Sequence, residues 1–324
     1  VETAPVLEAV GNYKQDKPSE NLRTKPAEEG KIRSHVQKML RGELALSGAD
    51  ADIFNNYYNL FKFPMLTLAD AESLRKLPEE RAKFFREHLE DTKAIQPVHN
   101  HLADIALEYF LRVANENYHP AVRFNAMTVI SLLNDQEKVT TGAQKMNPEP
   151  FTRALQPMVT AFEREDQLDL VRLAALTGIV RHFELDSFRL PNDRIPEQLR
   201  NEVLTLFTKL AQQKKPPAER TAGGHLWMRS KAIEGLGYSQ FNKAVLPTVE
   251  VLDSLIGDEK EAISIRVAAA HALGRANWSG GLKYDVQASL GRISDLLSDI
   301  FTAEKSRFEL ERKRAAEAVG PVSA

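Results

Sequence analysis

The chain repeats one short pattern four times, and each copy is centred on an arginine. The copies read HPAVRFNAMTVI, DLVRLAALTGIV, LWMRSKAIEGLG and ISIRVAAAHALG, with Arg123, Arg172, Arg229 and Arg266 as their arginines. An apolar residue precedes each arginine, an alanine follows three residues later, and Ile or Leu follows seven residues later. An internal repeat constrains the architecture more than any local pattern, because each copy needs neighbours to bury its apolar face.

The recurring positions share one face of an α-helix, because residues three, four and seven apart lie above one another. The alanine three after each arginine lets a second helix approach closely, and these alanines are Ala126, Ala175, Ala232 and Ala269. Small residues six after the arginine (Gly178, Gly235 and Ala272) are expected to allow tight packing against the next copy. We interpret the arginine as structural, binding acidic or carbonyl groups of the previous turn or copy, rather than as a basic ladder for a ligand.

A longer helical stretch precedes each copy, so the pattern predicts helix pairs. The predicted first helices cover 102–114, 151–162, 199–210 and 245–256. The spacing between copies is unequal, which indicates loop insertions at 140–148, 186–196 and 214–224. An acidic or amide residue six before the arginine, Asp166 or Asn117, appears in two copies only. A degenerate fifth copy around Arg312 is expected to close the array with a polar face.

Residues 265–274, IRVAAAHALG, most resemble the HEAT-like repeats named after phycobilisome lyases, and the other copies resemble HEAT repeats. The resemblance covers roughly residues 97–320. It implies an armadillo-like α-solenoid, most often a scaffold that binds proteins on its concave face. Some relatives handle tetrapyrroles, and a divergent branch excises alkylated bases. The predicted fold is therefore all-α: about five HEAT-like helical hairpins in a right-handed α-solenoid with an N-terminal helical cap.

The segments before the repeats predict two further regions. Residues 1–30 contain Pro5, Pro18 and Pro26 without a steady period, which is typical of an extended N-terminal arm. Residues 31–96 are helical but do not fit the repeat, and they form the predicted cap before the solenoid at 97–324. Its aromatic stretch, 53–63, follows helical spacing and is interpreted as the core of the cap, with an exposed anchor for a partner as the alternative.

Composition excludes several classes of function. The formal net charge is −2, from 43 basic and 45 acidic residues, so no overall field attracts a nucleic acid. The absence of cysteine excludes disulfides, thiolate metal sites and cysteine nucleophiles. No apolar run is long enough to span a membrane. Because the chain starts at Val1, we expect that a leader was removed and that the protein is an exported, periplasmic bacterial protein.

Four local clusters carry candidate chemistry, and each has a structural interpretation. His99 and His101 are two residues apart and point to different sides of a helix, so they do not chelate one metal. The glycine-bearing stretches 221–225 and 279–283 lack the arrangement of a phosphate-binding loop and are interpreted as turns. The basic region 214–231 is interpreted as a solvated loop. His182, His225 and His271 lie near repeat helices, where a hydrogen-bonded structural histidine is the commoner outcome.

The predicted function is a non-catalytic scaffold or adaptor that binds a protein partner, without a cofactor or metal. The expected binding residues lie two and five after the arginines, where the copies differ: Asn125, Thr128, Thr177, Lys231, Glu234 and His271. The alternative is a small-ligand or tetrapyrrole-handling, lyase-like protein, which needs a pocket with acids or histidine. A nucleic-acid-binding solenoid is a further alternative, but it needs a basic groove that the net charge disfavours.

Overall fold

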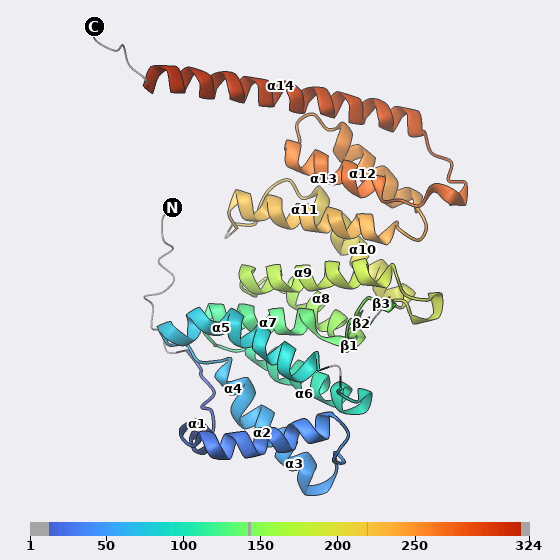
Figure 1. Ribbon diagram of the computed structural model, residues 1–324. Coiled ribbons are helices and arrows are strands. Elements are labelled where there is room, and N and C mark those ends of the chain that lie inside the picture. Colours follow the sequence, from blue (N-terminus) through green and yellow to red (C-terminus); the bar gives the residue numbers. More distant parts are fainter. Residues whose placement is uncertain (1–12, 92, 142–143, 219, 319–324) are drawn as a thin grey trace. The chain divides into compact units, whose positions relative to one another are not determined.

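The computed structural model describes residues 13–91, 93–141, 144–218 and 220–318, and nearly all of its regular structure is α-helical (Figure 1). This confirms the prediction of an all-α protein. The chain divides into two compact units, Val1–Leu199 and Arg200–Ala324. The boundary falls within the region 97–324 that we expected to form one array, and the first two repeat copies share a unit with the predicted cap.

The first unit begins with the helices of the cap: α1 (Glu20–Thr24), α2 (Pro26–Leu40), α3 (Gly48–Tyr57), the π-helix η2 (Tyr58–Lys62), α4 (Phe63–Met65), α5 (Ala71–Phe84) and the π-helix η3 (Phe85–Leu89). It continues with α6 (Gln96–Asn115), α7 (Pro120–Leu132), the 3-10 turn η4 (Thr152–Ala154), α8 (Leu155–Glu163), α9 (Asp169–Asp186) and the 3-10 turn η5 (Pro191–Asp193). The second unit is formed by α10 (Glu197–Gln212), α11 (Ala222–Ser239), α12 (Leu246–Gly257), α13 (Ile263–Gly274), the 3-10 turn η6 (Trp278–Gly280) and α14 (Val286–Ala318).

Each arginine-centred copy is the second helix of a pair, as predicted. Helix α6 packs on α7 and α8 on α9 in the first unit, and α12 packs on α13 in the second. The four alanines at the +3 position are buried: Ala126 is 1% exposed, and Ala175, Ala232 and Ala269 are 0% exposed. Successive second helices also touch, α7 against α9 and α11 against α13. The small residues of the pattern therefore lie where helices press together.

The small residues at the +6 position pack in a different direction from the one we expected. A Cβ atom on Gly178 would lie 2.4 Å from Met158 Sδ of its own pair and 2.5 Å from Ser131 Cβ of the preceding pair. One on Gly235 would lie 2.4 Å from the ring of Phe207, in the first helix of its own pair. The expected contact with the next copy is thus corrected: these positions face their own first helix and the preceding pair.

The repeated arginine closes the end of the helix before it. Its Nε atom donates to the carbonyl of the penultimate residue of the preceding helix in all four copies. The bonds run from Arg123 to Ala114 at 3.0 Å, from Arg172 to Phe162 at 2.8 Å, from Arg229 to Ala211 at 3.0 Å and from Arg266 to Ile256 at 2.9 Å. The last carbonyls of a helix lack intrahelical donors and lie at its negative end, so a guanidinium there is doubly favourable. The structural interpretation of the arginine is confirmed.

The same guanidinium also reaches the next copy. Arg123 Nη2 donates to Gln167 Oε1 at 2.5 Å, and Arg229 donates to both carboxylate oxygens of Glu261, at 2.9 and 2.6 Å. Gln167 and Glu261 each stand five residues before the next arginine. The position six before, which we singled out in the sequence, makes other contacts, because Asp166 binds Arg164 at 2.7 Å. The linking position was therefore missed by one residue.

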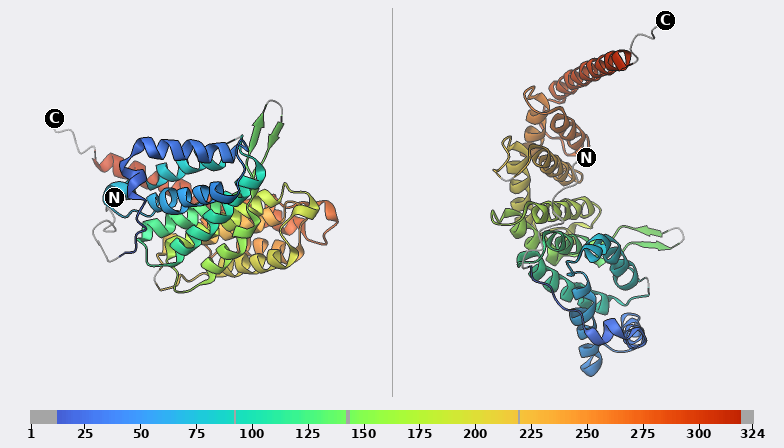
Figure 2. Two further views of the ribbon diagram at one scale, coloured as in Figure 1. Left: turned by 90° about the horizontal axis from the view of Figure 1, so that it is seen from below. Right: turned by 90° about the vertical axis from the view of Figure 1, so that its left-hand side faces the viewer.

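The predicted loop insertion after α7 contains short strands rather than only irregular chain. Strand β1 (Asn134–Gln136) pairs antiparallel with β4 (Glu149–Pro150), and β2 (Val139–Thr141) pairs antiparallel with β3 (Gln144–Met146). Figure 2 shows the β2–β3 ribbon standing away from the helices of the first unit. The β-branched residues at 139–141 favour an extended backbone, and pairing satisfies its amides and carbonyls.

The C-terminal segment forms one helix, α14, and the predicted fifth pair is wrong. Arg312 lies inside this helix and is exposed. No glycine or proline interrupts residues 292–318, so nothing in the sequence breaks the segment into two helices. Leu296 is buried at 2% exposure, whereas Phe301 and Phe308 are 72% and 66% exposed. The expected polar closing face is therefore also corrected, because α14 presents aromatic side chains.

The N-terminal segment is extended only in part. We expected an extended arm over 1–30, but α1 begins at Glu20 and α2 at Pro26. Proline is favourable at the first position of a helix, and Glu28 and Glu29 in the first turn of α2 interact well with the helix dipole. These local preferences explain the correction. Residues 1–12 of the predicted arm lie outside the described residues.

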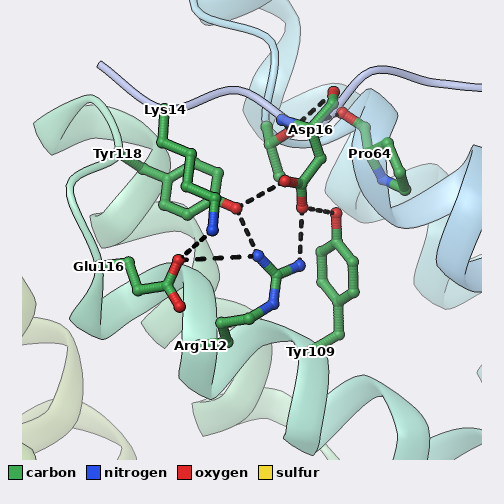
Figure 3. A network of polar contacts seen from close by, with 8 residues as sticks. Lys14, Asp16, Pro64, Tyr109, Arg112, Glu116 and Tyr118 are labelled. Atoms are coloured by element: carbon green, nitrogen blue, oxygen red, sulfur yellow. Dashed lines mark hydrogen bonds and ion pairs between the residues drawn. The ribbon is translucent and has the colours of Figure 1, made fainter. Parts of the chain in front are cut away.

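A partly buried network of hydrogen bonds around Asp16 holds the described part of the arm. Figure 3 shows its carboxylate between Tyr109, Arg112 and Tyr118, which come from α6 and the turn after it. Tyr118 donates to Oδ1 at 2.7 Å, and Arg112 and Tyr109 donate to Oδ2 at 2.7 and 2.5 Å. Burial alone would raise the pKa of Asp16, but these hydrogen bonds outweigh it and hold the pKa below the usual value. The side chain of Asp16 is therefore bound as a charged carboxylate. Its backbone N–H donates a hydrogen bond to Thr67 Oγ1 at 3.1 Å.

The aromatic stretch of the cap forms its core, as we interpreted it. Phe54 and Tyr58 are 0% exposed and Tyr57 is 1% exposed. The ring of Tyr58 lies 5.5 Å from that of Phe63, and its hydroxyl lies 3.0 Å from His88 Nδ1. These rings are therefore not available as an anchor for a partner.

Candidate binding surface

The six predicted binding residues are spread over both units and differ in exposure. Thr177 and His271 are exposed, Thr128, Lys231 and Glu234 are half-buried, and Asn125 is buried. In the first unit, the hydroxyls of Thr128 and Thr177 donate to carbonyls of their own helices at 2.8 and 2.9 Å. Lys231, Glu234 and His271 lie on neighbouring helices of the second unit, so the structure brings these three toward one surface.

Asn125 corrects the expectation that this face of α7 is open. The residue is 2% exposed, and its Oδ1 atom accepts a hydrogen bond from Arg81 Nη1 at 2.6 Å. Arg81 belongs to α5, which packs across α7. The cap therefore covers in the first unit the helix face that the sequence assigned to a partner.

The corresponding face of α11 in the second unit carries an open row of bonded side chains. Lys231 Nζ lies 5.7 Å from the ring centroid of Trp227 and 2.7 Å from Glu234 Oε2. Tyr238 donates its hydroxyl to Glu234 Oε1 at 3.3 Å. Trp227 is 39% exposed, so part of its indole is open to solvent. The row thus holds an accessible indole beside a fixed pair of charges.

Helix α13 continues the open face with apolar residues. Ile263 and Val267 are 40% and 42% exposed, and His271 one turn later is exposed as well. The guanidinium of Arg275 lies 4.3 Å from the ring centroid of Tyr238 and so joins this helix to the row on α11. We name the eight residues on these two helices the α11–α13 surface: Trp227, Lys231, Glu234, Tyr238, Ile263, Val267, His271 and Arg275.

Sequence reasoning missed five residues of this surface, although a simple signal was present. The positions two and five after the arginine lie on a helical stripe that continues to two before and nine after it. In α11 these added positions are Trp227 and Tyr238, and in α13 the last of them is Arg275. Ile263 and Val267 border the stripe, and only their measured exposure distinguishes them from packing residues.

The α11–α13 surface combines charged, aromatic and aliphatic side chains. Lys231 forms an ion pair with Glu234, and Arg275 lies over the ring of Tyr238, with aliphatic groups beside them. Within the described residues, no group of three or more His, Cys, Asp or Glu side chains is placed to hold a metal ion. Such a surface offers apolar area, aromatic rings and a few oriented charges, which are the contacts typical of protein interfaces.

Each of the candidate histidines has its own surroundings, and among the described residues none shares a ligand site with another. His99 Nε2 lies 3.3 Å from Glu137 and His101 Nε2 lies 2.7 Å from Asn55, so they do not share a ligand. His225 donates from Nε2 to the carbonyl of Gln213 at 2.5 Å, which confirms a structural role. His182 is buried, and its Nε2 atom has no hydrogen-bond partner among the described residues. Burial lowers the pKa of His182 to about 3, with a further contribution from Arg181 and Arg189, so this ring is neutral.

The other two candidate clusters are also structural. The glycine-bearing stretch 221–225 is not a separate turn but the start of α11, where Thr221 Oγ1 accepts from Gly224 N at 3.1 Å. The stretch 279–283 does contain a turn, with Gly281 at a φ of 65°. In the basic region, Arg229 is 1% exposed and bound to Glu261, and Lys214 forms an ion pair with Asp258. The basic region therefore does not form an exposed anion-binding patch around Arg229.

Comparisons with known proteins add no assignment to this geometry. The chain matches no protein-family model, no curated protein and no solved structure. Over the described residues, no helix combines the length and apolar character needed to cross a bilayer.

Proposed function

We propose that this protein is a non-catalytic adaptor that binds a protein partner through the α11–α13 surface. The observation that carries the proposal is the joint exposure of Trp227, Ile263 and Val267, at 39%, 40% and 42%, beside a bonded polar row. Large aromatic side chains surrounded by apolar and oriented polar groups dominate the binding energy of protein interfaces.

The polar row supports this function because its geometry is already set. Glu234 accepts hydrogen bonds from both Lys231 and Tyr238, at 2.7 and 3.3 Å. Binding therefore orders few additional side chains, and each long side chain that need not be ordered saves about 0.5–1.5 kcal/mol. The α11–α13 surface also supplies Glu234 together with Lys231 and Arg275, which favours a partner with mixed charge over a polyanion.

We further propose that the four copies are HEAT-like repeats and that their helix pairs form an α-solenoid. The support is the arginine bond to the penultimate carbonyl of the preceding helix in every copy, together with the link from Arg123 to Gln167 and from Arg229 to Glu261. The carbonyl bonds join the two helices of each pair, and the two links join the first pair to the second and the third pair to the fourth. A solenoid of this kind places the second helices of its pairs on the concave face, which is where the α11–α13 surface would lie.

The test is a comparison of partner capture by two double variants of the full chain. Trp227→Ala with Val267→Asp removes the indole and charges the apolar part of the surface. Thr205→Asp with Glu250→Ala adds one acid and removes another at exposed positions of α10 and α12, and serves as the control for changes outside the surface. A partner captured by the wild type is identified by mass spectrometry, and its affinity is then measured with each purified variant.

We expect the surface variant to weaken binding at least about tenfold, because a central aromatic contributes about 2 kcal/mol or more. The control variant should bind like the wild type. A partner that binds both variants equally well would locate its site elsewhere and refute the assignment. Loss of binding by the control alone would move the interface to the first helices of the pairs.

A further inference from the structure

A separate cavity in the cap combines positive charge with an apolar wall. It has a volume of about 310 Å³ and lies between α1, α2, η2 and α5, in the first unit. We name it the α2–α5 pocket. Its size is at the lower end of that of small-molecule sites, which measure about 300–1,000 Å³. The pocket does not involve the α11–α13 surface, so an inference from it stands independently of the proposed adaptor function.

Cations outnumber acids around the pocket. Its wall carries Arg23, Arg33, Lys62 and Lys83, against the carboxylates of Glu29 and Glu80. Glu29 is already engaged, because it accepts a hydrogen bond from the hydroxyl of Tyr57 at 3.0 Å and lies 3.9 Å from Arg33 Nε.

Among the described residues, the two lysines of the wall have no carboxylate in direct contact. Within the described part of the chain, neither Lys62 nor Lys83 forms an ion pair or a side-chain hydrogen bond. Both side chains are half-buried, so water screens them less than ordinary surface lysines. The wall is thus arranged for an anion to lie between them.

The titration of neighbouring groups is consistent with a positive field in this part of the cap. Burial lowers the pKa of Lys62, and the charge of Lys83 lowers it further, although Glu87, Glu29 and Glu80 act in the opposite direction. Burial also lowers the pKa of His88 to about 3, with additional contributions from Lys62, Arg33 and Lys83. A bound negative charge would raise the pKa of these groups toward its ordinary value, because it stabilises their protonated forms.

The remaining wall is apolar. Phe61, Met65 and Phe84 come from η2, α4 and α5, and Leu22 and Pro26 complete this side. An inorganic anion would satisfy the lysines but would leave these groups against water. A ligand with an anionic end and an aromatic or short aliphatic end satisfies both parts of the wall.

We propose that the α2–α5 pocket binds a small amphipathic organic anion, with its phosphate or carboxylate at Lys62 and Lys83 and its apolar group against Phe61 and Phe84. The protein would then carry a ligand site in the cap in addition to a protein-binding surface. The proposal concerns binding alone and requires no chemical step.

The test uses isothermal titration calorimetry of the full chain with three probes. Phenyl phosphate carries both features of the ligand, inorganic phosphate carries only the charge, and phenol carries only the ring. We expect phenyl phosphate to bind at one site at least about tenfold more tightly than either fragment, and to weaken as salt is added. Equal affinity for phenyl phosphate and inorganic phosphate would overturn the proposal, because it would leave the apolar wall without a role.

Three variants locate the site. Lys62→Gln and Lys83→Gln should each weaken phenyl phosphate about tenfold, whereas Lys38→Gln, an exposed residue on the same helix as Arg33, should bind like the wild type. Thermal unfolding of each variant checks that it folds, and a folded Lys62→Gln or Lys83→Gln is sufficient for the comparison. Unchanged affinity in both pocket variants, or no heat from phenyl phosphate with the wild type, would refute the assignment.

Discussion

In the first unit, Arg123 reaches the next copy through the neutral amide of Gln167, whereas in the second unit Arg229 reaches it through the carboxylate of Glu261. Both arginines also bind the carbonyl of the penultimate residue of the preceding helix. We call this arginine with its two partners the joint between copies, and its geometry is the same in both units. The difference shows that the end of the preceding helix fixes where the guanidinium lies, while the linking residue is free to be neutral or charged. What changes is the consequence of breaking the joint.

Helices α7 and α11, one from each unit, also differ in what covers the equivalent face. Helix α5 covers α7 through the bond from Arg81 to Asn125, while α11 and α13 keep Trp227 and Val267 exposed. The position two after the arginine is thus core on α7 and partly exposed on α11, while Thr177, five after the arginine of α9, stays exposed in the first unit as well. The repeat pattern sets which positions point outward, but a neighbouring element decides whether they meet solvent.

The largest expected difference between the units follows from removing their arginines. Arg229→Ala leaves Glu261 charged and buried without its partner, so we expect the second unit to lose about 3–5 kcal/mol of unfolding free energy. Arg123→Ala leaves only neutral groups unpaired and should cost the first unit about 1–3 kcal/mol.

Urea unfolding separates the two effects, because both tryptophans, Trp227 and Trp278, belong to the second unit. Arg229→Ala should shift the fluorescence transition, and Arg123→Ala should shift mainly the transition followed by far-ultraviolet circular dichroism. Equal losses in the two variants would show that the charge of Glu261 does not distinguish the joints.

A smaller effect is expected from filling the close approaches between second helices. A Cβ on Gly178 would lie 3.0 Å from Ser131 Cα in the first unit, and one on Gly237 would lie 2.9 Å from Ala272 Cα in the second. Backbone atoms cannot rotate away, so Gly178→Ala and Gly237→Ala should each destabilise their unit by about 1–3 kcal/mol.

The matched controls are glycines inside helices that have open space around them, Gly30 in α2 and Gly291 in α14. Replacing these by alanine should stabilise the protein by about 0.4–1 kcal/mol, because alanine restricts the unfolded chain. Thermal unfolding measures all four variants. Destabilisation by the controls as well would mean that crowding between helices is not the cause.

The smallest expected effect comes from making the joint of the second unit resemble that of the first. Burial favours a raised pKa for Glu261, but hydrogen bonds from Arg229 and from Ala262 N outweigh it and lower the pKa below its ordinary value of 4.5. A carboxyl with a lowered folded-state pKa contributes stability above its ordinary value, and this contribution is lost as the pH falls through the folded-state pKa. The wild type should therefore lose part of this stability below pH 4.5.

Glu261→Gln removes that contribution, so it should cost about 1 kcal/mol at neutral pH and flatten the acid limb of the stability profile. Glu259→Gln, at an exposed neighbouring position, should keep the wild-type profile. The measurement is the urea midpoint, followed by tryptophan fluorescence, at neutral and acidic pH. A Glu261→Gln protein that still loses stability as steeply as the wild type on acidification would assign the loss to other carboxyls.

Much of the helical structure was predictable because apolar and small residues recur at helical spacing around each arginine. The alanines three after the arginines are buried because two helices must approach there, and this follows from side-chain size alone. The fifth pair around Arg312 was predicted wrongly because its spacing imitates the pattern without any residue that breaks the helix. The pocket in the cap was not foreseen, since its cations come from separate helices with no shared spacing.

By itself, the sequence determined the positions that pack and the positions that point outward, because helical periodicity is a local property of the backbone. Only the tertiary structure decided that Asn125 is covered by Arg81 while Trp227 stays exposed. It also decided that Gln167 and Glu261, rather than the residues before them, receive the guanidinium. These outcomes depend on which elements meet in space, and a contact between residues far apart in the chain leaves no periodic trace in either segment.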